Sequence, residues 1–130
     1  MWNPIAERNL PVILRISGAG TMGAGLLFLA PATVLGMIGV TVGDDAGMFF
    51  VRHWGLLAAC IGALLFYSAA SPALRVPVMA AASVEKLALL AMLAQGAHNP
   101  ALTGLQSAAG FDILCVLLFV PVLWRNWRPV

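Results

Sequence analysis

The chain has 130 residues, of which 62% are hydrophobic and only 9% are charged, and its formal net charge at pH 7 is +2. Soluble domains are roughly 45–50% apolar and about 25% charged, so this chain has too little polar surface to cover a water-soluble globule. A net charge this small, with no basic run among aromatic residues, argues against a nucleic-acid-binding domain. The composition therefore predicts an integral membrane protein.

At about 20 apolar residues per crossing, the length allows four transmembrane helices and leaves no room for a separate soluble domain. We therefore predict an all-α, integral membrane four-helix bundle, with residues 1–130 forming a single domain. The expected spans cover residues 4–30, 46–70, 72–95 and 100–124.

The first span is predicted to open at Asn3-Pro4, because asparagine accepts unpaired backbone hydrogen bonds and proline at the first helical position loses none. The run that follows is rich in small residues, which favours the close approach of another helix. A secretory signal peptide is the alternative, since Ala30-Pro31-Ala32 resembles a cleavage site. Arg15 interrupts the apolar region, and this favours a spanning helix.

Residues 31–43, PATVLGMIGVTVG, are apolar but too short and too glycine-rich to cross the membrane again. We expect this short segment to lie in the membrane interface or to pack back over the bundle. The acidic pair at 44–45 then predicts the start of the second span, because carboxylates are stabilised at the positive end of a helix dipole. A Ser-Pro pair at 71–72 and an Asn-Pro pair at 99–100 predict the next two helix starts.

The start of the fourth helix decides the depth of Asp112. If the helix begins at Asn99, Asp112 lies close to its middle. If it begins near Ser107, Asp112 lies in its outer third.

The distribution of arginine predicts the orientation of the spans. With four crossings, the two termini and the loop between the second and third spans lie on one side, and the opposite loops carry no lysine or arginine. By the positive-inside rule, both termini are expected in the cytoplasm, with the protein in a bacterial inner membrane. Aromatic residues are expected in belts at both faces. The basic side carries Arg8, Arg75, Arg125 and Arg128, with Trp2, Tyr67, Trp124 and Trp127 in its belt, and the other belt holds Phe49, Phe50 and Trp54.

Several ionisable residues lie within the predicted spans, where a lipid-facing charge costs roughly 2.5 to 3.5 kcal/mol. The two arginines and the two acids each share a helical face with small residues, so we expect these side chains to point inward. The candidate ligand-binding or buried polar cluster consists of Arg15, Arg52, His53, Glu85, Lys86 and Asp112.

Depth along the helices suggests how these groups pair. We expect Arg52 to pair with Asp112 or Glu85, and Arg15 to reach Glu85 from the cytoplasmic half. Lys86 is turned about 100° from Glu85, and either completes the network or extends towards a neighbouring subunit. Two interpretations remain open: the charges fix the register of the helices, or they form a ligand or proton site.

Other site chemistry has little support in the sequence. His53 is expected to hydrogen-bond within the bundle, and haem ligation by two histidines is disfavoured because His98 lies in an outer loop. Cys60 and Cys115 sit alone in different apolar runs and are expected to be small core residues. Without a nucleophile elbow, phosphate loop or metal motif, we predict no catalytic residue, no metal and no resident cofactor.

The chain resembles small bacterial membrane proteins of the DoxX-like and DUF4345 type. The features that carry the resemblance are the length, four spans, and a proline-broken apolar loop after the first span. Two sequence motifs add to it: Arg52-x-x-Gly55 at the entry to the second span, and Glu85-Lys86 in the third. The resemblance implies a membrane helix bundle and a tie to quinone-linked or redox membrane complexes.

The leading functional hypothesis is a non-enzymatic binding or accessory subunit. It would hold a lipophilic molecule such as a quinone or lipid, or dock to a larger membrane complex or to further copies of itself through small-residue faces. One alternative is a homo-oligomeric proton-coupled transporter with Glu85 or Asp112 at a subunit interface. The other is an enzyme acting on a membrane-dissolved substrate, which requires an apolar pocket that opens to lipid beside an acid/base carboxylate.

Overall fold

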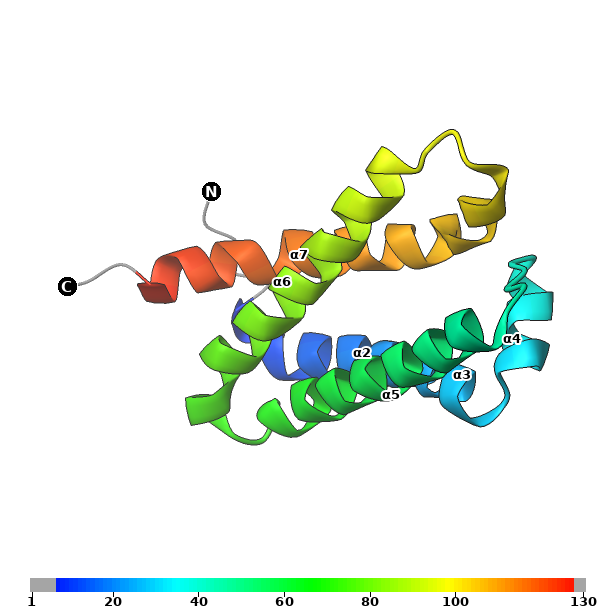
Figure 1. Ribbon diagram of the computed structural model, residues 1–130. Helices are drawn as coiled ribbons and strands as arrows, with labels where there is room; N and C mark the ends of the chain where they lie inside the picture. Colours follow the sequence, from blue (N-terminus) through cyan, green and yellow to red (C-terminus); the bar gives the residue numbers. More distant parts are fainter. Residues whose placement is uncertain (1–6, 128–130) are drawn as a thin grey trace.

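The computed structural model describes residues 7–127, and within this range it contains helices and no strand (Figure 1). The elements in chain order are α2 (Leu10–Met22), η1 (Gly23–Gly25), α3 (Leu26–Leu29), α4 (Pro31–Ile38), α5 (Asp45–Ser68), α6 (Pro72–Gln95), η2 (Pro100–Leu105) and α7 (Gln106–Trp127), where η denotes a 3₁₀ helix.

Four helical segments are long and apolar enough to cross a membrane: Leu10–Leu29, Asp45–Ser68, Pro72–Gln95 and Pro100–Trp127. The all-helical fold is confirmed, and the protein is a multi-pass membrane helix bundle. The predicted Asn3-Pro4 helix start lies outside the described residues.

The four long helices are packed together at one end of the bundle and separate towards the other. At the end where the described chain begins and finishes, all four contribute to one core, with Leu14 of α2, Leu65 of α5, Met79 of α6 and Phe119 of α7 fully buried. Figure 1 shows α2 alongside α5, while α6 crosses obliquely and moves away from α5 towards the opposite end. The space left at that wide end contains the cavities described below.

Glycine allows α2 and α5 to pack backbone against backbone. A Cβ on Gly62 would lie 2.5 Å from the Met22 nitrogen, and a Cβ on Gly18 would lie 2.7 Å from the Gly62 carbonyl oxygen. Farther along α5, a Cβ on Gly55 would lie 2.7 Å from the Ala24 carbonyl oxygen. Gly18 of the first span and Gly62 of the second thus let the two helices approach closely, as the small-residue content of the first span predicts.

The segment after the first span forms a short helix at the wide end. Pro31 begins α4, and Gly39, with φ of +71°, ends it in the left-handed conformation that glycine adopts without strain. Leu35 of α4 is buried, and Gly104 of η2 packs directly against the carbonyl group of Ile38. The segment therefore packs back over the bundle and closes part of its wide end.

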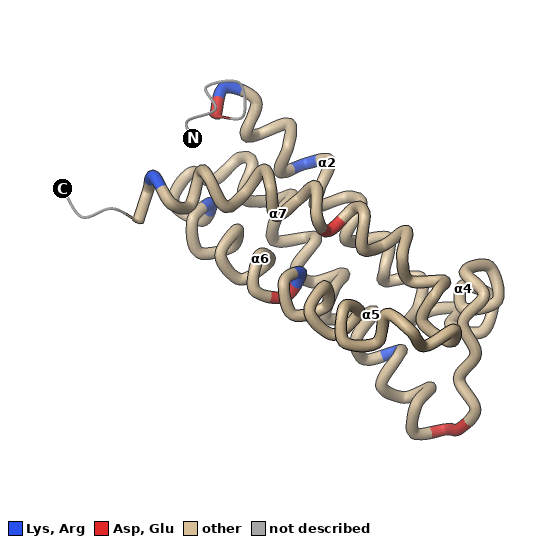
Figure 2. The backbone as a smooth tube through the Cα atoms, turned by 90° about the horizontal axis from the view of Figure 1, so that it is seen from above, with Lys and Arg blue, Asp and Glu red and all other residues tan. Residues whose placement is uncertain are grey.

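Local capping explains several of the helix boundaries. The Asp44 carboxylate accepts a 2.6 Å hydrogen bond from the Gly47 backbone N–H at the start of α5, as predicted. At the end of α5, the Arg75 guanidinium donates to the backbone carbonyls of Ser68 and Ala69, which neutralises the negative end of the helix dipole. Figure 2 shows the adjacent acidic residues at the start of α5, far from the end where the described chain begins and finishes.

The two starting points considered for the fourth span correspond to different elements. The Asn99 side chain accepts a 3.0 Å hydrogen bond from the Ala101 N–H and caps η2, while the α-helix begins at Gln106. Asp112 therefore lies in the first third of α7, but near the middle of the whole Pro100–Trp127 segment.

Candidate functional site

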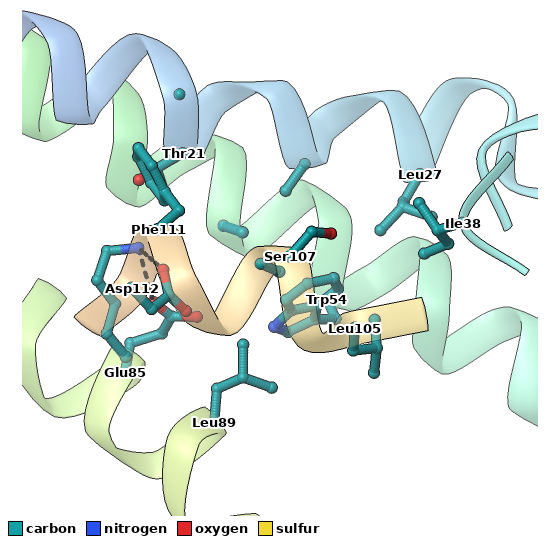
Figure 3. A pocket seen from close by; sticks show the side chains of 15 residues that line it. Thr21, Leu27, Ile38, Trp54, Glu85, Leu89, Leu105, Ser107, Phe111 and Asp112 are labelled. Carbon is teal, nitrogen blue, oxygen red and sulfur yellow. Dashed lines mark hydrogen bonds and ion pairs between the residues drawn. The ribbon is translucent and has the colours of Figure 1, made fainter. Parts of the chain in front are cut away.

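A buried ion pair joins α6 to α7. Lys86 is 2% exposed and Asp112 is 5% exposed, and the lysine Nζ donates a 2.6 Å hydrogen bond to Asp112 Oδ1. Glu85 Oε2 lies 3.9 Å from the same Nζ (Figure 3). The Lys86 ammonium also lies 5.2 Å from the centre of the Phe111 ring, within the range of a cation–π contact. We call Glu85, Lys86 and Asp112 the charged triad.

Helical periodicity explains why Lys86 is the inward residue of the Glu-Lys pair. The buried residues of α6 are Met79, Ala82, Ser83 and Lys86, which follow the i, i+3, i+4, i+7 spacing of one helical face. Glu85 is one position off this face and is half-buried at its margin. The spacing of these residues is visible in the sequence. The small residues near Glu85 predicted instead that Glu85, and not Lys86, points to the centre of the bundle.

Asp112 lies on a similar stripe of α7. Cys115, Phe119 and Val122 are buried with it, at the spacing of one helical face. Asp112 therefore points into the bundle, as predicted.

The predicted pairing of Arg52 with Asp112 or Glu85 is wrong, because Asp112 is paired with Lys86. Arg52 is exposed on α5, where its Nε donates a 3.2 Å hydrogen bond to the Phe28 carbonyl oxygen and its guanidinium lies 5.3 Å from the Phe28 ring centre. Arg52 precedes the buried Gly55 by three residues, so it lies about 60° around the helix from Gly55, at the margin of the buried face and away from the other buried residues of α5. Its long side chain turns outward from that margin.

Arg15 and His53 are also outside the triad. Arg15 is exposed on α2, and no ion pair joins it to Glu85 within the described part of the chain. His53 is exposed and lies parallel to the Phe49 ring, with 6.3 Å between ring centres, instead of hydrogen-bonding inside the bundle. The structure therefore brings together three of the six residues proposed from the sequence.

The cysteines differ from one another in position. Cys115 is buried beside Asp112 on α7, and both thiols are free. Cys60 is exposed on α5, which corrects its expected place in the core.

Trp54 is a site residue that the sequence reasoning missed. It was assigned to an aromatic belt, but it is half-buried inside the bundle, and its side chain lines both cavities described below together with Glu85. Its position one turn before the buried Ala58 could have shown that it faces inward. On α2, the hydroxyl oxygen of Thr21 is buried and has no hydrogen-bond partner among the described residues.

Two adjoining open cavities meet at Glu85 and Trp54. The inner cavity, about 320 Å³, lies over the charged triad and is lined in addition by Thr21 and Phe111 (Figure 3). The outer cavity, about 420 Å³, is almost wholly apolar. Its walls come from α3, α4, α5, α6 and η2 and include Leu27, Leu35, Val51, Ala88, Met92 and Leu105.

The hydrogen bonding of the triad is incomplete. Glu85 Oε2 is buried and has no hydrogen-bond partner within the described residues, although Lys86 is nearby. A buried polar atom without a partner costs about 1–3 kcal/mol, and more if it is charged. A group that enters the cavities and reaches Oε2 can recover part of this energy. No set of three or more metal-ligating side chains occurs among residues 7–127.

Comparisons with protein-family models, with curated proteins and with solved structures give no match for this chain. The functional argument therefore depends on the geometry of the site.

Proposed function

We propose that this protein is a non-enzymatic membrane protein that binds one lipophilic molecule, with the polar end of the molecule at Glu85 and its apolar body in the outer cavity. The observation that carries the proposal is the cavity itself. It is open and almost wholly apolar, and it ends at a buried carboxylate oxygen that lacks a hydrogen-bond partner within the described chain.

The size and chemistry of the cavities support a small-molecule site. Such sites usually have volumes of roughly 300–1,000 Å³, with mostly apolar walls and a few polar groups that orient the ligand. Each of the two cavities falls within this range, and apart from Glu85 and Trp54, which line both, the polar groups line the inner one. A lipid-soluble molecule can reach such a site from the bilayer without crossing water.

The enzyme hypothesis also gains one supporting observation. An enzyme acting on a membrane-dissolved substrate requires an apolar pocket beside an acid/base carboxylate, and Glu85 lies beside such a pocket. The transporter hypothesis fits less well, because the Lys86–Asp112 pair is buried between helices of the same chain. Binding remains our first choice because the outer cavity is almost wholly apolar, and because the buried hydroxyls of Thr21 and Ser83 have no general base bonded to them in the described residues.

The test is native mass spectrometry of protein purified in mild detergent, followed by extraction of co-purified molecules. Wild type is expected to retain a lipophile at one per chain, and Glu85→Gln is expected to lose most of it. Arg52→Gln is the matched control, because Arg52 is an ionisable residue that lies outside both cavities. Folded, ligand-free wild type, or equal retention by Glu85→Gln, would contradict the proposal.

We further propose that the protein lies in a bacterial inner membrane with both termini in the cytoplasm. Arginine supports this orientation: an Arg125–Glu7 ion pair and the Arg75 cap lie at the basic end, whereas Asp44 and Asp45 lie at the start of α5 at the other. In this orientation α4 lies at the outer interface, where the 82% exposed Met37 would contact lipid.

A reporter fused to the C-terminus tests the orientation. A fluorescent protein that folds only in the cytoplasm should be bright there, and alkaline phosphatase, which is active only outside, should be inactive. The reverse result would place the termini outside and remove the basis for the interfacial position of α4.

A further inference from the structure

We infer that the ligand of the outer cavity carries a protonated amine as its polar group. This inference rests on the proposed function, because it names the chemistry of the molecule that the same cavity would hold.

The charge balance of the triad is the first argument. It contains one ammonium group and two carboxylates. Lys86 makes its short hydrogen bond to Asp112, 2.6 Å long, whereas its distance to Glu85 Oε2 is 3.9 Å, too long for a hydrogen bond. The hydrogen-bond partner of Lys86 is therefore Asp112. Glu85 has the same ammonium only as a longer ion-pair partner at 3.9 Å, so one negative charge of the triad is left unbalanced, and a second cation would balance it.

Among the described residues, Lys86 is the one cation that forms an ion pair with Glu85. The charged groups that act on Glu85 are Lys86 and Asp112. Arg52 lies on α5 two residues before Trp54, but its side chain points away from Glu85 and contacts Phe28. The cation that the site lacks would therefore have to come from a bound molecule.

Glu85 Oε2 has no hydrogen-bond partner among the described residues, so a ligand that binds there should donate a hydrogen bond to it. An ionised carboxylate only accepts hydrogen bonds, and an ammonium group has three donors and no acceptor. A charge-assisted hydrogen bond of this type is roughly twice as strong as one between neutral groups. A carboxylate or phosphate head group would instead meet Glu85 and Asp112 with like charge, so an anionic lipophile is disfavoured.

Trp54 adds a second preference for a cation. Its ring lines both cavities and lies next to Glu85, and the indole face is the aromatic surface that attracts cations best. The rest of the outer cavity consists of aliphatic side chains from five elements and offers no second polar anchor. The fitting molecule is therefore an amine with a single apolar chain or ring system, not a polyamine or a zwitterion.

Three brominated probes of equal chain length test this inference: 12-bromododecylamine, 12-bromododecanol and 12-bromododecanoate. Bromine quenches tryptophan fluorescence at short range, so a probe in the outer cavity should quench Trp54. The protein is placed in nanodiscs of zwitterionic lipid at pH 7, where a primary amine is protonated. The same titrations on Trp54→Phe measure the quenching of the other tryptophans, which is subtracted.

We expect saturable quenching by the amine, with an affinity about tenfold or more above that of the alcohol, and no saturable quenching by the carboxylate. In Glu85→Gln the affinity for the amine should fall by about tenfold or more, while the affinity for the alcohol should fall much less, because the glutamine oxygen still accepts a hydrogen bond from a hydroxyl. The alcohol thus reports whether the variant still has a folded cavity.

The possible failures are distinguishable. If the alcohol or the carboxylate binds as tightly as the amine, the inferred head group is wrong, while the proposed binding function stands. If the amine is preferred equally in wild type and Glu85→Gln, the inference is also overturned, because the charge that it depends on is not responsible. If no probe gives saturable quenching and wild type co-purifies with no lipophile, the proposed function itself fails.

Discussion

Lys86 and Asp112 illustrate the cost of placing charge inside a membrane bundle. Each is almost fully buried, and each has the other as its short hydrogen-bond partner. Buried pairs add little net stability compared with apolar residues of similar volume, but removal of one partner leaves an uncompensated charge. The effect of a substitution at this pair should therefore depend strongly on whether one partner or both are changed.

We expect Asp112→Asn to destabilise the protein by about 3–5 kcal/mol, because it leaves the Lys86 ammonium buried without its short partner. The double variant Lys86→Met/Asp112→Leu should lose much less, because no buried charge remains unpaired. Denaturant titration in detergent micelles, followed by circular dichroism, measures both. Equal losses in the single and double variants would show that the pair is not the source of the effect.

Substitution of Arg52, unlike substitution of Asp112, should have little effect on stability. Its side chain is exposed and makes one hydrogen bond to a backbone carbonyl, so Arg52→Gln should change stability by no more than about 1 kcal/mol. The same titration measures it. A loss comparable to that of Asp112→Asn would mean that Arg52 has a buried partner, as the sequence alone suggested.

The contact between α2 and α5 depends on the absence of side chains. Because a Cβ on Gly62 would lie 2.5 Å from the Met22 nitrogen, Gly62→Ala must push the two helices apart. We expect a loss of about 1–3 kcal/mol, the usual cost of overpacking. Thermal unfolding of the purified protein is the measurement.

Gly110→Ala provides the matched control for this helix contact. Gly110 lies inside α7, and a Cβ there would meet nothing within 4 Å. The change should be neutral or stabilising by up to about 1 kcal/mol, because alanine favours the helix. If both variants lose similar stability, close packing at Gly62 is not the cause.

At the scale of the whole molecule, the bundle combines a packed end with an open one. The shared core at the end near the termini fixes the helices, while the separation of α6 from α5 leaves the cavities at the other end. Because the core and the cavities occupy different ends, the binding capacity should be removable without loss of the fold.

Ala88→Leu tests this separation. Ala88 lines the outer cavity, so the larger side chain should fill part of it and reduce the co-purified lipophile, or the quenching by the amine probe, by about tenfold. Ala81→Leu is the control, since Ala81 is also exposed on α6, two turns earlier on the same face, and lies outside both cavities. Stability should be nearly unchanged in both variants. Equal binding by Ala88→Leu and wild type would show that the ligand does not occupy the outer cavity.

Much of the fold could be predicted from composition and local sequence. An apolar fraction of 62% forces most of the surface to face lipid, and proline, glycine and capping residues mark the helix ends. These signals depend only on the chain near each position, so they hold whichever helices later pack together. They account for the all-helical class, the four long apolar segments and the cap at Asp44.

The partners of the charged groups depended on the tertiary structure. Helical spacing says which residues share a face, but not which of two neighbouring faces turns inward, and this ambiguity explains the wrong pairing of Arg52 and the missed role of Trp54. The choice is made by the close approach of α2 to α5 and by the oblique path of α6, which bring Lys86 to Asp112 and leave Glu85 at the edge of a cavity. The sequence by itself determined a membrane-spanning helical protein, because that follows from hydrophobicity summed along the chain. Only the tertiary structure decided where the charges meet and where the cavity opens, because both depend on the angles at which distant segments cross.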